Sequence, residues 1–294
     1  MANPLSIGQK VYRHPGLAVA HLCKHINYSI TRQRFYRKGT DIFAEDWDVL
    51  IILDALREDT FQSLVDLPGQ TEKRLSKGSA TKEFIRGNCS GKSLNDVVCV
   101  SANHRYYKHS NEMDFNFCEL ILVDRDGPDQ ITSTPQRVVA KALEAYNKFD
   151  DKRILIHFMQ PHQPFIGEIG QGFPRGEGIH KVAKQSDISK KDIIKAYNEN
   201  TKLALKAVRK LMNKMEGRMV VTSDHGELLG DMIPYTPFSV FGHPEGFYHN
   251  KLITVPWHIF EVGPRRQVSS GKIDQSSEYN IDKINENLRD LGYK

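Results

Sequence analysis

The sequence predicts an α/β protein, a three-layer α/β/α sandwich around a mostly parallel central sheet. From Trp47 onward, short runs of aliphatic and β-branched residues alternate with longer amphipathic stretches. Strands and helices that alternate at this spacing form a parallel sheet with helices on both faces. The 294-residue chain is 39% hydrophobic and 26% charged, which is typical of a globular protein and excludes a disordered or fibrous one.

Five apolar runs are predicted as strands. The first, WDVLIIL at residues 47–53, is almost continuously apolar, as expected for a central parallel strand that is buried on both faces. The last contains Pro256, which has no N–H for the ladder of hydrogen bonds, so we expect an edge or bulged strand there. The strands are expected at residues 47–53, 96–101, 153–159, 218–223 and 253–260.

The stretches between these strands predict helices that cover the sheet. Thr134, which is followed by a proline, is typical of an N-cap, and an apolar stripe with helical spacing follows it. A longer helix is expected after Ser189 and before Gly217. Residues 166–180 and 231–249 show little periodicity and are predicted as surface loops, which in compact domains often serve as lids.

The charge divides the chain into a basic N-terminal arm, residues 1–45, and a domain expected to span residues 46–294. The chain has 41 Lys and Arg against 36 Asp and Glu, and the arm alone accounts for the net charge of +5. Such an arm can bind nucleic acid, an anionic membrane surface or an anionic substrate, or it can pack on the main domain as a partly helical lead-in. No specific nucleic-acid motif accompanies it.

The chain is expected to be cytoplasmic. No run approaches the ~20 apolar residues of a transmembrane segment, and the apolar stretch at residues 16–23 is too short for a signal peptide. The four cysteines include no Cys-x-x-Cys pair, so a structural zinc knuckle is not indicated. Without an export signal, these cysteines are expected to be reduced.

Polar side chains follow four of the predicted strands, at the points where the strands end. Ligands of an open parallel sheet bind beyond the carboxyl ends of its strands, so these side chains would meet if the four strands were neighbours. Carboxylate and imidazole together suit Zn²⁺ or Mn²⁺. Each residue taken singly also has a structural explanation, such as an aspartate that caps a helix. The residues are Asp54, Asn103, His104, His162, Asp224, His225 and Glu227.

Five short motifs occur along the chain in a definite order. They are LDALRED at residues 53–59, PHQPF at 161–165, DHGELLG at 224–230, VP at 255–256 and LRDLGY at 288–293. In this order and spacing the sequence resembles the alkaline phosphatase/sulfatase superfamily, most closely its sulfatase-like branch. The resemblance covers nearly the whole predicted domain.

The resemblance implies a metal centre beside groups that bind an anionic ester. One divalent ion, Zn or Mn, would be held firmly, and imidazoles would contact the nonbridging oxygens of the ester. His104 matches such a position less closely than the other two histidines do. The implied metal ligands are Asp54, Thr81, Asp224 and His225. The implied substrate-binding residues are His162, His243 and His104.

The resemblance also implies a nucleophile at the start of a helix, and residues 77–86 are the matching segment. We choose Thr81, because a hydroxyl at a helix N-terminus lies where free N–H groups favour an anion. Ser79 is the alternative nucleophile, and either hydroxyl can instead be a plain N-cap. Arg57 can pair with Asp59 or reach the substrate.

Three departures from the family pattern narrow the prediction. The chain lacks the Cys-x-Pro/Ala-x-Arg motif of formylglycine sulfatases, and Leu53 stands where many sulfatases carry the first of two aspartates. The Asp-x-x-Gly-His element of two-metal members is also absent. These departures favour one metal and a phosphorus ester, while a second ion bound through His162 and His243 stays open.

The resulting prediction is a metal-dependent hydrolase or transferase of phosphate esters, less so of sulfate esters, that acts through a covalent Thr intermediate. Two alternatives stay open. One is a non-catalytic protein that keeps the fold and binds a polyanion, and the other is a phosphotransferase that acts on a glycan or lipid head group.

Overall fold

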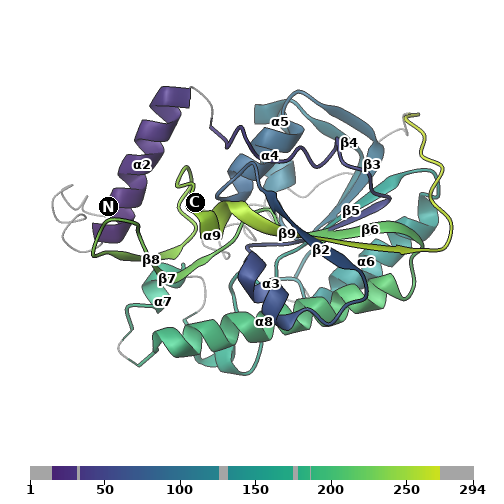
Figure 1. Ribbon diagram of the computed structural model, residues 1–294. Coiled ribbons are helices and arrows are strands. Elements are labelled where there is room, and N and C mark those ends of the chain that lie inside the picture. Colours follow the sequence, from purple (N-terminus) through teal and green to yellow (C-terminus); the bar gives the residue numbers. More distant parts are fainter. Residues whose placement is uncertain (1–14, 32–33, 126–131, 175–177, 186, 272–294) are drawn as a thin grey trace.

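The computed structural model describes residues 15–31, 34–125, 132–174, 178–185 and 187–271 (Figure 1). Within these ranges, seven strands form one sheet in the order β2–β9–β6–β1–β5–β3–β4. Its neighbouring strands are parallel except in the two pairs that include β9. The strands are β1 (Val49–Leu53), β2 (Gln70–Leu75), β3 (Ser93–Ser101), β4 (Asn116–Leu122), β5 (Arg153–Phe158), β6 (Gly217–Thr222) and β9 (Thr254–Val262).

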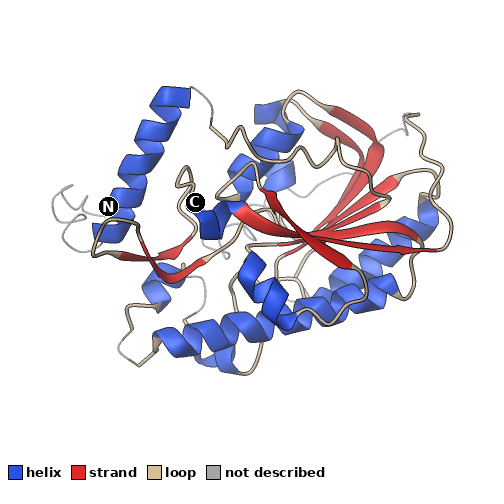
Figure 2. Ribbon diagram, viewed as in Figure 1, coloured by secondary structure: helices blue, strands red, loops and turns tan. Residues whose placement is uncertain are grey.

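Helices cover both faces of this sheet, which confirms the predicted three-layer α/β/α fold (Figure 2). The helices of one face are α3 (Glu58–Leu64), α6 (Pro135–Lys148) and α8 (Lys190–Met212), and those of the other are α4 (Thr81–Cys89) and α5 (Arg105–Met113). On β1, Val49 and Ile51 pack toward the first face, whereas Leu50 and Ile52 pack toward the second. The strand is apolar throughout because both of its faces are buried.

The capping signals in the sequence mark where two of the helices begin. The Thr134 hydroxyl accepts a hydrogen bond from the backbone N–H of Arg137 at the start of α6. The Ser189 hydroxyl does the same for Asp192 at the start of α8. Each side chain satisfies an N–H group that has no partner within its own helix.

The prediction that the last strand is an edge or bulged strand is wrong. β9 lies between β2 and β6, and its pairing with both is in continuous register. Pro256 is tolerated because it lies one residue beyond the last pair between β6 and β9, which joins Thr222 to Trp257. Its missing N–H therefore removes no bond to β6, and its carbonyl accepts a hydrogen bond from the Thr222 hydroxyl at 2.7 Å.

Both predicted loops contain regular structure. In residues 231–249, β8 (Ser239–Gly242) pairs with β7 (Leu228–Met232) as a two-stranded antiparallel sheet. The other segment contains a short 3₁₀ helix, η1 (Ile169–Gly172), and the start of α7 (Ile179–Val182). A last short helix, α9 (Asn250–Ile253), leads directly into β9.

The described part of the N-terminal arm contains one helix, α2 (Pro15–Thr31), which packs beside β8 at one end of the molecule (Figure 1). Ala20 on its inner face is fully buried in a cluster with Val240 and Leu252. The predicted boundary between arm and domain, at residue 45, stays a prediction. The basic residues Lys10, Arg13 and Arg32 and the motif at residues 288–293 lie outside the described residues.

Two further observations concern membranes and cysteines. No helix in the described part of the chain is long and apolar enough to cross a membrane. The four cysteines all lie within the described ranges, and they form no disulfide with one another.

Candidate active site and metal centre

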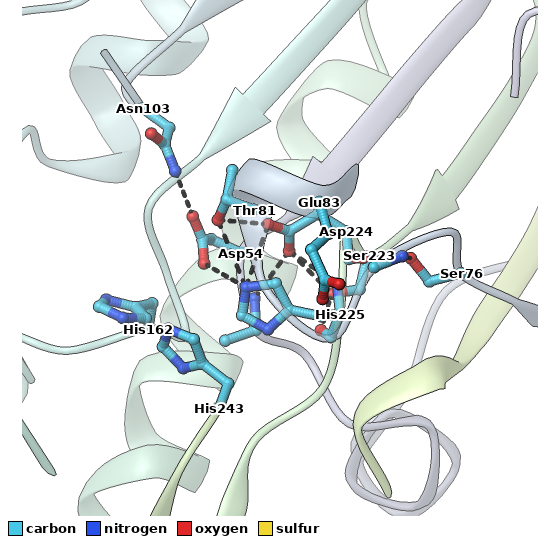
Figure 3. Close-up of polar contacts among 12 residues, drawn as sticks. Asp54, Ser76, Thr81, Glu83, Asn103, His162, Ser223, Asp224, His225 and His243 are labelled. Carbon is cyan, nitrogen blue, oxygen red and sulfur yellow. Dashed lines mark hydrogen bonds and ion pairs between the residues drawn. The ribbon is translucent and has the colours of Figure 1, made fainter. Parts of the chain in front are cut away.

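The strand ends that carry the predicted site residues are neighbours in the sheet, because β6, β1, β5 and β3 lie side by side. Asp54 follows β1, and Asp224 and His225 follow β6. The structure buries these three side chains completely and brings them together, with one ligand atom of each within 4.8 Å of the others (Figure 3). Two carboxylates and an imidazole therefore face one small volume.

The Asp54 carboxylate has one satisfied oxygen and one free oxygen. Its Oδ2 accepts a hydrogen bond from Asn103 Nδ2 at 2.7 Å, whereas the buried Oδ1 accepts none from the described residues. A buried carboxylate oxygen without a partner is costly unless a ligand satisfies it. Burial raises the pKa of Asp54, but His157 and His162 beside it outweigh burial and hold the pKa below its usual range. The carboxylate is thus an anion with one buried oxygen that no described donor satisfies.

The His225 ring is oriented as metal-binding histidines are. Its Nδ1 donates a hydrogen bond to the carbonyl of Gly226 at 2.8 Å, so the neutral ring leaves the lone pair of Nε2 free. That Nε2 lies 3.3 Å from Asp224 Oδ2 and 3.8 Å from Asp54 Oδ1. Burial lowers the pKa of His225, but the two carboxylates outweigh it and raise the pKa. The group as a whole favours positive charge at its centre, and its donors fit a divalent cation.

Residue 226, directly after Asp224 and His225, has to be glycine because no side chain fits there. A Cβ at this position would collide with the carbonyl oxygen of Lys251. The N–H of Gly226 donates to the carbonyl of Leu252 at 2.7 Å, which ties the turn after β6 to α9. This close approach of two backbone segments fixes the direction of Asp224 and His225.

Thr81 is the first residue of α4, and its hydroxyl faces the carboxylate–imidazole group. Its Oγ1 donates to Asp224 Oδ2 at 2.8 Å and lies 3.3 Å from His225 Nε2. The N-cap of α4 is Ala80, whose side chain makes no capping bond, so neither Thr81 nor Ser79 is an N-cap. Ser79 instead donates to Glu83 at 2.7 Å, away from the group.

Glu83 in the first turn of α4 holds this region together. The side chain is fully buried and accepts hydrogen bonds from three segments of the chain. The donors are the N–H and hydroxyl of Ser79, the hydroxyls of Tyr28 and Tyr248, and the N–H of Gly246. One carboxylate therefore connects α2, the start of α4 and the loop after β8.

A second group of ligand atoms lies next to the first. His162, Glu227 and His243 also bring one ligand atom each to within 4.8 Å of the others. The His243 ring centroid is 5.1 Å from that of His162 and 4.4 Å from that of His225, so the rings form a continuous series. His243 Nδ1 lies 3.1 Å from both Glu227 oxygens, and His162 Nδ1 donates to the carbonyl of Gln163.

Burial sets the charges of this second group. It raises the pKa of Glu227 to about 7 and lowers the pKa of His243 to about 3. Burial also lowers the pKa of His162. Both rings are then neutral near pH 7, and each uses Nδ1 for a hydrogen bond.

The sequence assigned no role to Glu227 and gave no sign of His157. Glu227 was expected among the polar residues that meet at the strand ends, but it was not named as a ligand or a substrate-binding residue. His157 is a polar residue within the apolar run of β5, and no pattern marked it. Its Nε2 lies 3.5 Å from Asp54 Oδ2 and 3.9 Å from Asp224 Oδ2, and its Nδ1 lies 3.0 Å from the Tyr106 hydroxyl.

Two other predicted residues lie elsewhere. His104 belongs to neither group of ligand atoms, and its Nε2 lies 3.4 Å from the carbonyl of Val123, so its role in substrate binding stays a prediction. Arg57 pairs with Asp59 at 2.7 Å and with Asp231 at 2.8 Å, which supports the structural role for it rather than contact with substrate.

A pocket of about 320 Å³ opens beside the second group. His162, Glu227 and His243 line one side of it, and Leu17 and His21 of α2 also line it. The pocket therefore adjoins the second group, and apolar side chains such as Leu17 and Phe241 also line it.

The chain is similar to several solved structures. No protein-family model and no curated protein sequence matches it. Among solved structures, the C-terminal periplasmic domain of EcEptC from Escherichia coli, in complex with Zn, has a TM-score of 0.51 and 12% identity, and the match covers 77% of this chain and 76% of that one. An alkaline phosphatase superfamily protein from Vibrio parahaemolyticus has a TM-score of 0.45 and 11% identity, over 93% of this chain and 75% of that one. The lipoteichoic acid synthase LtaP from Listeria monocytogenes has a TM-score of 0.43 and 15% identity, over 84% and 72%.

The first of these likenesses shows a shared fold. The mostly parallel seven-stranded sheet between two helical layers is the alkaline phosphatase-like fold that the motifs predicted. The chain therefore has the fold of the alkaline phosphatase/sulfatase superfamily. The periplasmic location belongs to the domain of EcEptC, and the cytoplasmic location of this chain stays a prediction.

Proposed function

We propose that the protein is a metal-dependent hydrolase or transferase of phosphate esters in which Thr81 is the nucleophile. One observation carries the proposal: the Thr81 hydroxyl, at the first position of α4, donates to a buried carboxylate of the Asp54–Asp224–His225 group. A plain N-cap would not explain this contact, because the N-cap is Ala80.

The proposed metal ligands are Asp54, Thr81, Asp224 and His225. The unpartnered Oδ1 of Asp54 supports this set, as does the hydrogen bond from His225 Nδ1, which leaves Nε2 as the ring atom that faces the carboxylates. The zinc bound by EcEptC, whose fold is shared, also supports it. When bound, a divalent ion in this set neutralises charge on the phosphoryl group and lowers the pKa of a coordinated hydroxyl. The second group, with Glu227 added to the two histidines, is open to a further ion.

The protein's own groups fit an in-line displacement. Thr81 Oγ1 attacks phosphorus, its proton passes to Asp224 Oδ2 at 2.8 Å, and the bond from phosphorus to the alcohol oxygen breaks. His162 and His243 line the pocket next to these groups. An anionic phosphoryl group beside these rings favours their protonated form, in which Nε2–H can donate to a nonbridging oxygen or to the leaving oxygen.

The test is to replace Thr81 by Ala and by Ser, with Ser79→Ala as the matched control. Turnover of bis(p-nitrophenyl) phosphate, p-nitrophenyl phosphate and p-nitrophenyl sulfate is measured with Zn²⁺ or Mn²⁺ added. Thr81→Ala should lower turnover by on the order of 10³-fold or more, while Thr81→Ser and Ser79→Ala retain most of it.

Intact-protein mass spectrometry after acid quenching adds a direct measurement. A phosphoryl group should appear on the wild type and be absent from Thr81→Ala. Undiminished turnover by Thr81→Ala would remove Thr81 from the mechanism, and a loss confined to Ser79→Ala would assign the reaction to that hydroxyl. Product that forms only when an alcohol acceptor is supplied would identify a transferase rather than a hydrolase.

A further inference from the structure

Helix α2 carries a stripe of exposed aliphatic side chains on its outer face. Leu22, Ile26 and Ile30 are 59%, 48% and 76% exposed. They are spaced by four residues, so they lie one above another on the same face of the helix. A row of three large apolar side chains in water is costly unless a partner covers it.

The opposite face of α2 is fixed to the rest of the protein. Lys24 forms an ion pair with Glu245 at 2.6 Å, and Asn27 donates to the carbonyl of Gly246 at 2.8 Å. Tyr28 donates to the buried Glu83 at 2.9 Å. Because these contacts hold the inner face, the exposed stripe lies on the side of α2 that faces away from them. The helix itself lies at one end of the molecule (Figure 1).

The sequence on both sides of this helix carries charge of one sign. The first 40 residues contain no Asp or Glu, and the arm holds basic residues both before and after the helix. Arg34, Arg37 and Lys38, which follow α2, are all exposed. An apolar helix face flanked by cationic side chains is the pattern of helices that lie in the interface of an anionic bilayer.

A second copy of the chain fits this surface less well. Stable protein interfaces bury roughly 800 Å² on each partner, which three partly exposed side chains do not supply. Two such arms face to face would also bring two basic segments together, which like-charge repulsion opposes. The charge and the small apolar area favour a lipid surface instead.

We propose that α2 docks the protein on the surface of an anionic lipid bilayer, with Leu22, Ile26 and Ile30 in the interface and the basic residues on the head groups. His21 of the same helix lines the pocket beside the second ligand group. Docking therefore brings a helix that lines this pocket onto the membrane. The proposal does not depend on the proposed catalytic function.

Binding of the full chain to vesicles tests it without any substrate. Sedimentation with phosphatidylcholine vesicles is compared with sedimentation with equal parts of phosphatidylcholine and phosphatidylglycerol. The test variant combines Leu22→Gln, Ile26→Gln and Ile30→Gln. The matched control combines Val262→Gln and Val268→Gln, which change side chains of 41% and 42% exposure elsewhere in the described chain.

The wild type and the control should bind the anionic vesicles at least tenfold more tightly than the neutral ones, and added salt should weaken this binding. The triple variant should lose the binding at least tenfold while its far-UV circular dichroism and its melting temperature match the wild type. The proposal is overturned if the wild type binds neither vesicle or if the triple variant binds as well as the wild type. A dimer that the triple variant abolishes, with no vesicle binding, would assign the surface to a second copy.

Discussion

Replacing Tyr106 by Phe isolates one buried hydrogen bond behind the site. The Tyr106 hydroxyl lies 3.0 Å from Nδ1 of His157, and both side chains are fully buried. Donation from the hydroxyl to Nδ1 leaves the other ring nitrogen, Nε2, to carry the proton toward the carboxylates of Asp54 and Asp224. The phenylalanine ring fills the same space, so the substitution removes a donor and leaves no cavity.

The expected loss follows from what remains after the substitution. A buried acceptor left without its donor costs about 1–3 kcal/mol, and for a chain of this size that lowers the melting temperature by roughly 2–4 °C per kcal/mol. The free energy of unfolding is measured by urea denaturation in EDTA, so that metal binding does not contribute. Tyr235→Phe, at a fully exposed tyrosine, is the matched control and should change it by less than about 0.5 kcal/mol. If Tyr106→Phe is as stable as this control, the hydrogen bond to His157 does not hold the ring as we describe.

Three further predictions concern metal affinity, packing and pH. His157→Gln should weaken Zn²⁺ binding about 10- to 100-fold in chelator competition. The control His258→Gln, which changes another buried strand histidine, should leave the Zn²⁺ affinity unchanged. If the two variants bind Zn²⁺ equally well, His157 does not position the metal ligands. Glu83→Ala should lower the free energy of unfolding by about 3 kcal/mol or more in urea melts, because several buried donors lose their acceptor; a loss below about 1 kcal/mol would contradict the network. Burial raises the pKa of Asp41, but hydrogen bonds from two lysines outweigh it and lower the pKa below its ordinary value of 3.8. The stability that the Asp41 carboxylate contributes is therefore present above pH 3.8 and is lost as the pH falls through the lowered pKa. The stability gap between wild type and Asp41→Asn should therefore be larger at pH 6 than at pH 3, and a gap that grows at pH 3 would refute the sign.

The strands that carry the site could be predicted from the sequence because they are central. β1 and β6 are buried on both faces, so their apolar runs are unbroken and the polar residue after each run stands out. The edge strand β2 was missed for the opposite reason. β2 reads QTEKRL, and most of its side chains are exposed, so it has no apolar run to recognise. An edge strand pairs on one side only and can face solvent, so its sequence need not contain the apolar run by which a central strand is recognised.

Part of the candidate site could also be predicted, because residues that follow the carboxyl ends of neighbouring parallel strands lie close together. Asp54, Asp224 and His225 follow from that rule. His157 does not, because a side chain within a strand reveals its neighbours only when the packing is known. Glu83 illustrates the same limit, since its partners come from residues as distant as Tyr28 and Gly246 and no local pattern joins them.

The central claim is that one cation binds between the two carboxylates and the imidazole beside the Thr81 hydroxyl. Anomalous diffraction at the zinc edge, from crystals grown with Zn²⁺, measures this directly. We predict a peak within bonding distance of Asp54, Asp224 and His225. A well-ordered site without such a peak, or zinc bound only at a position remote from these side chains, would contradict the account.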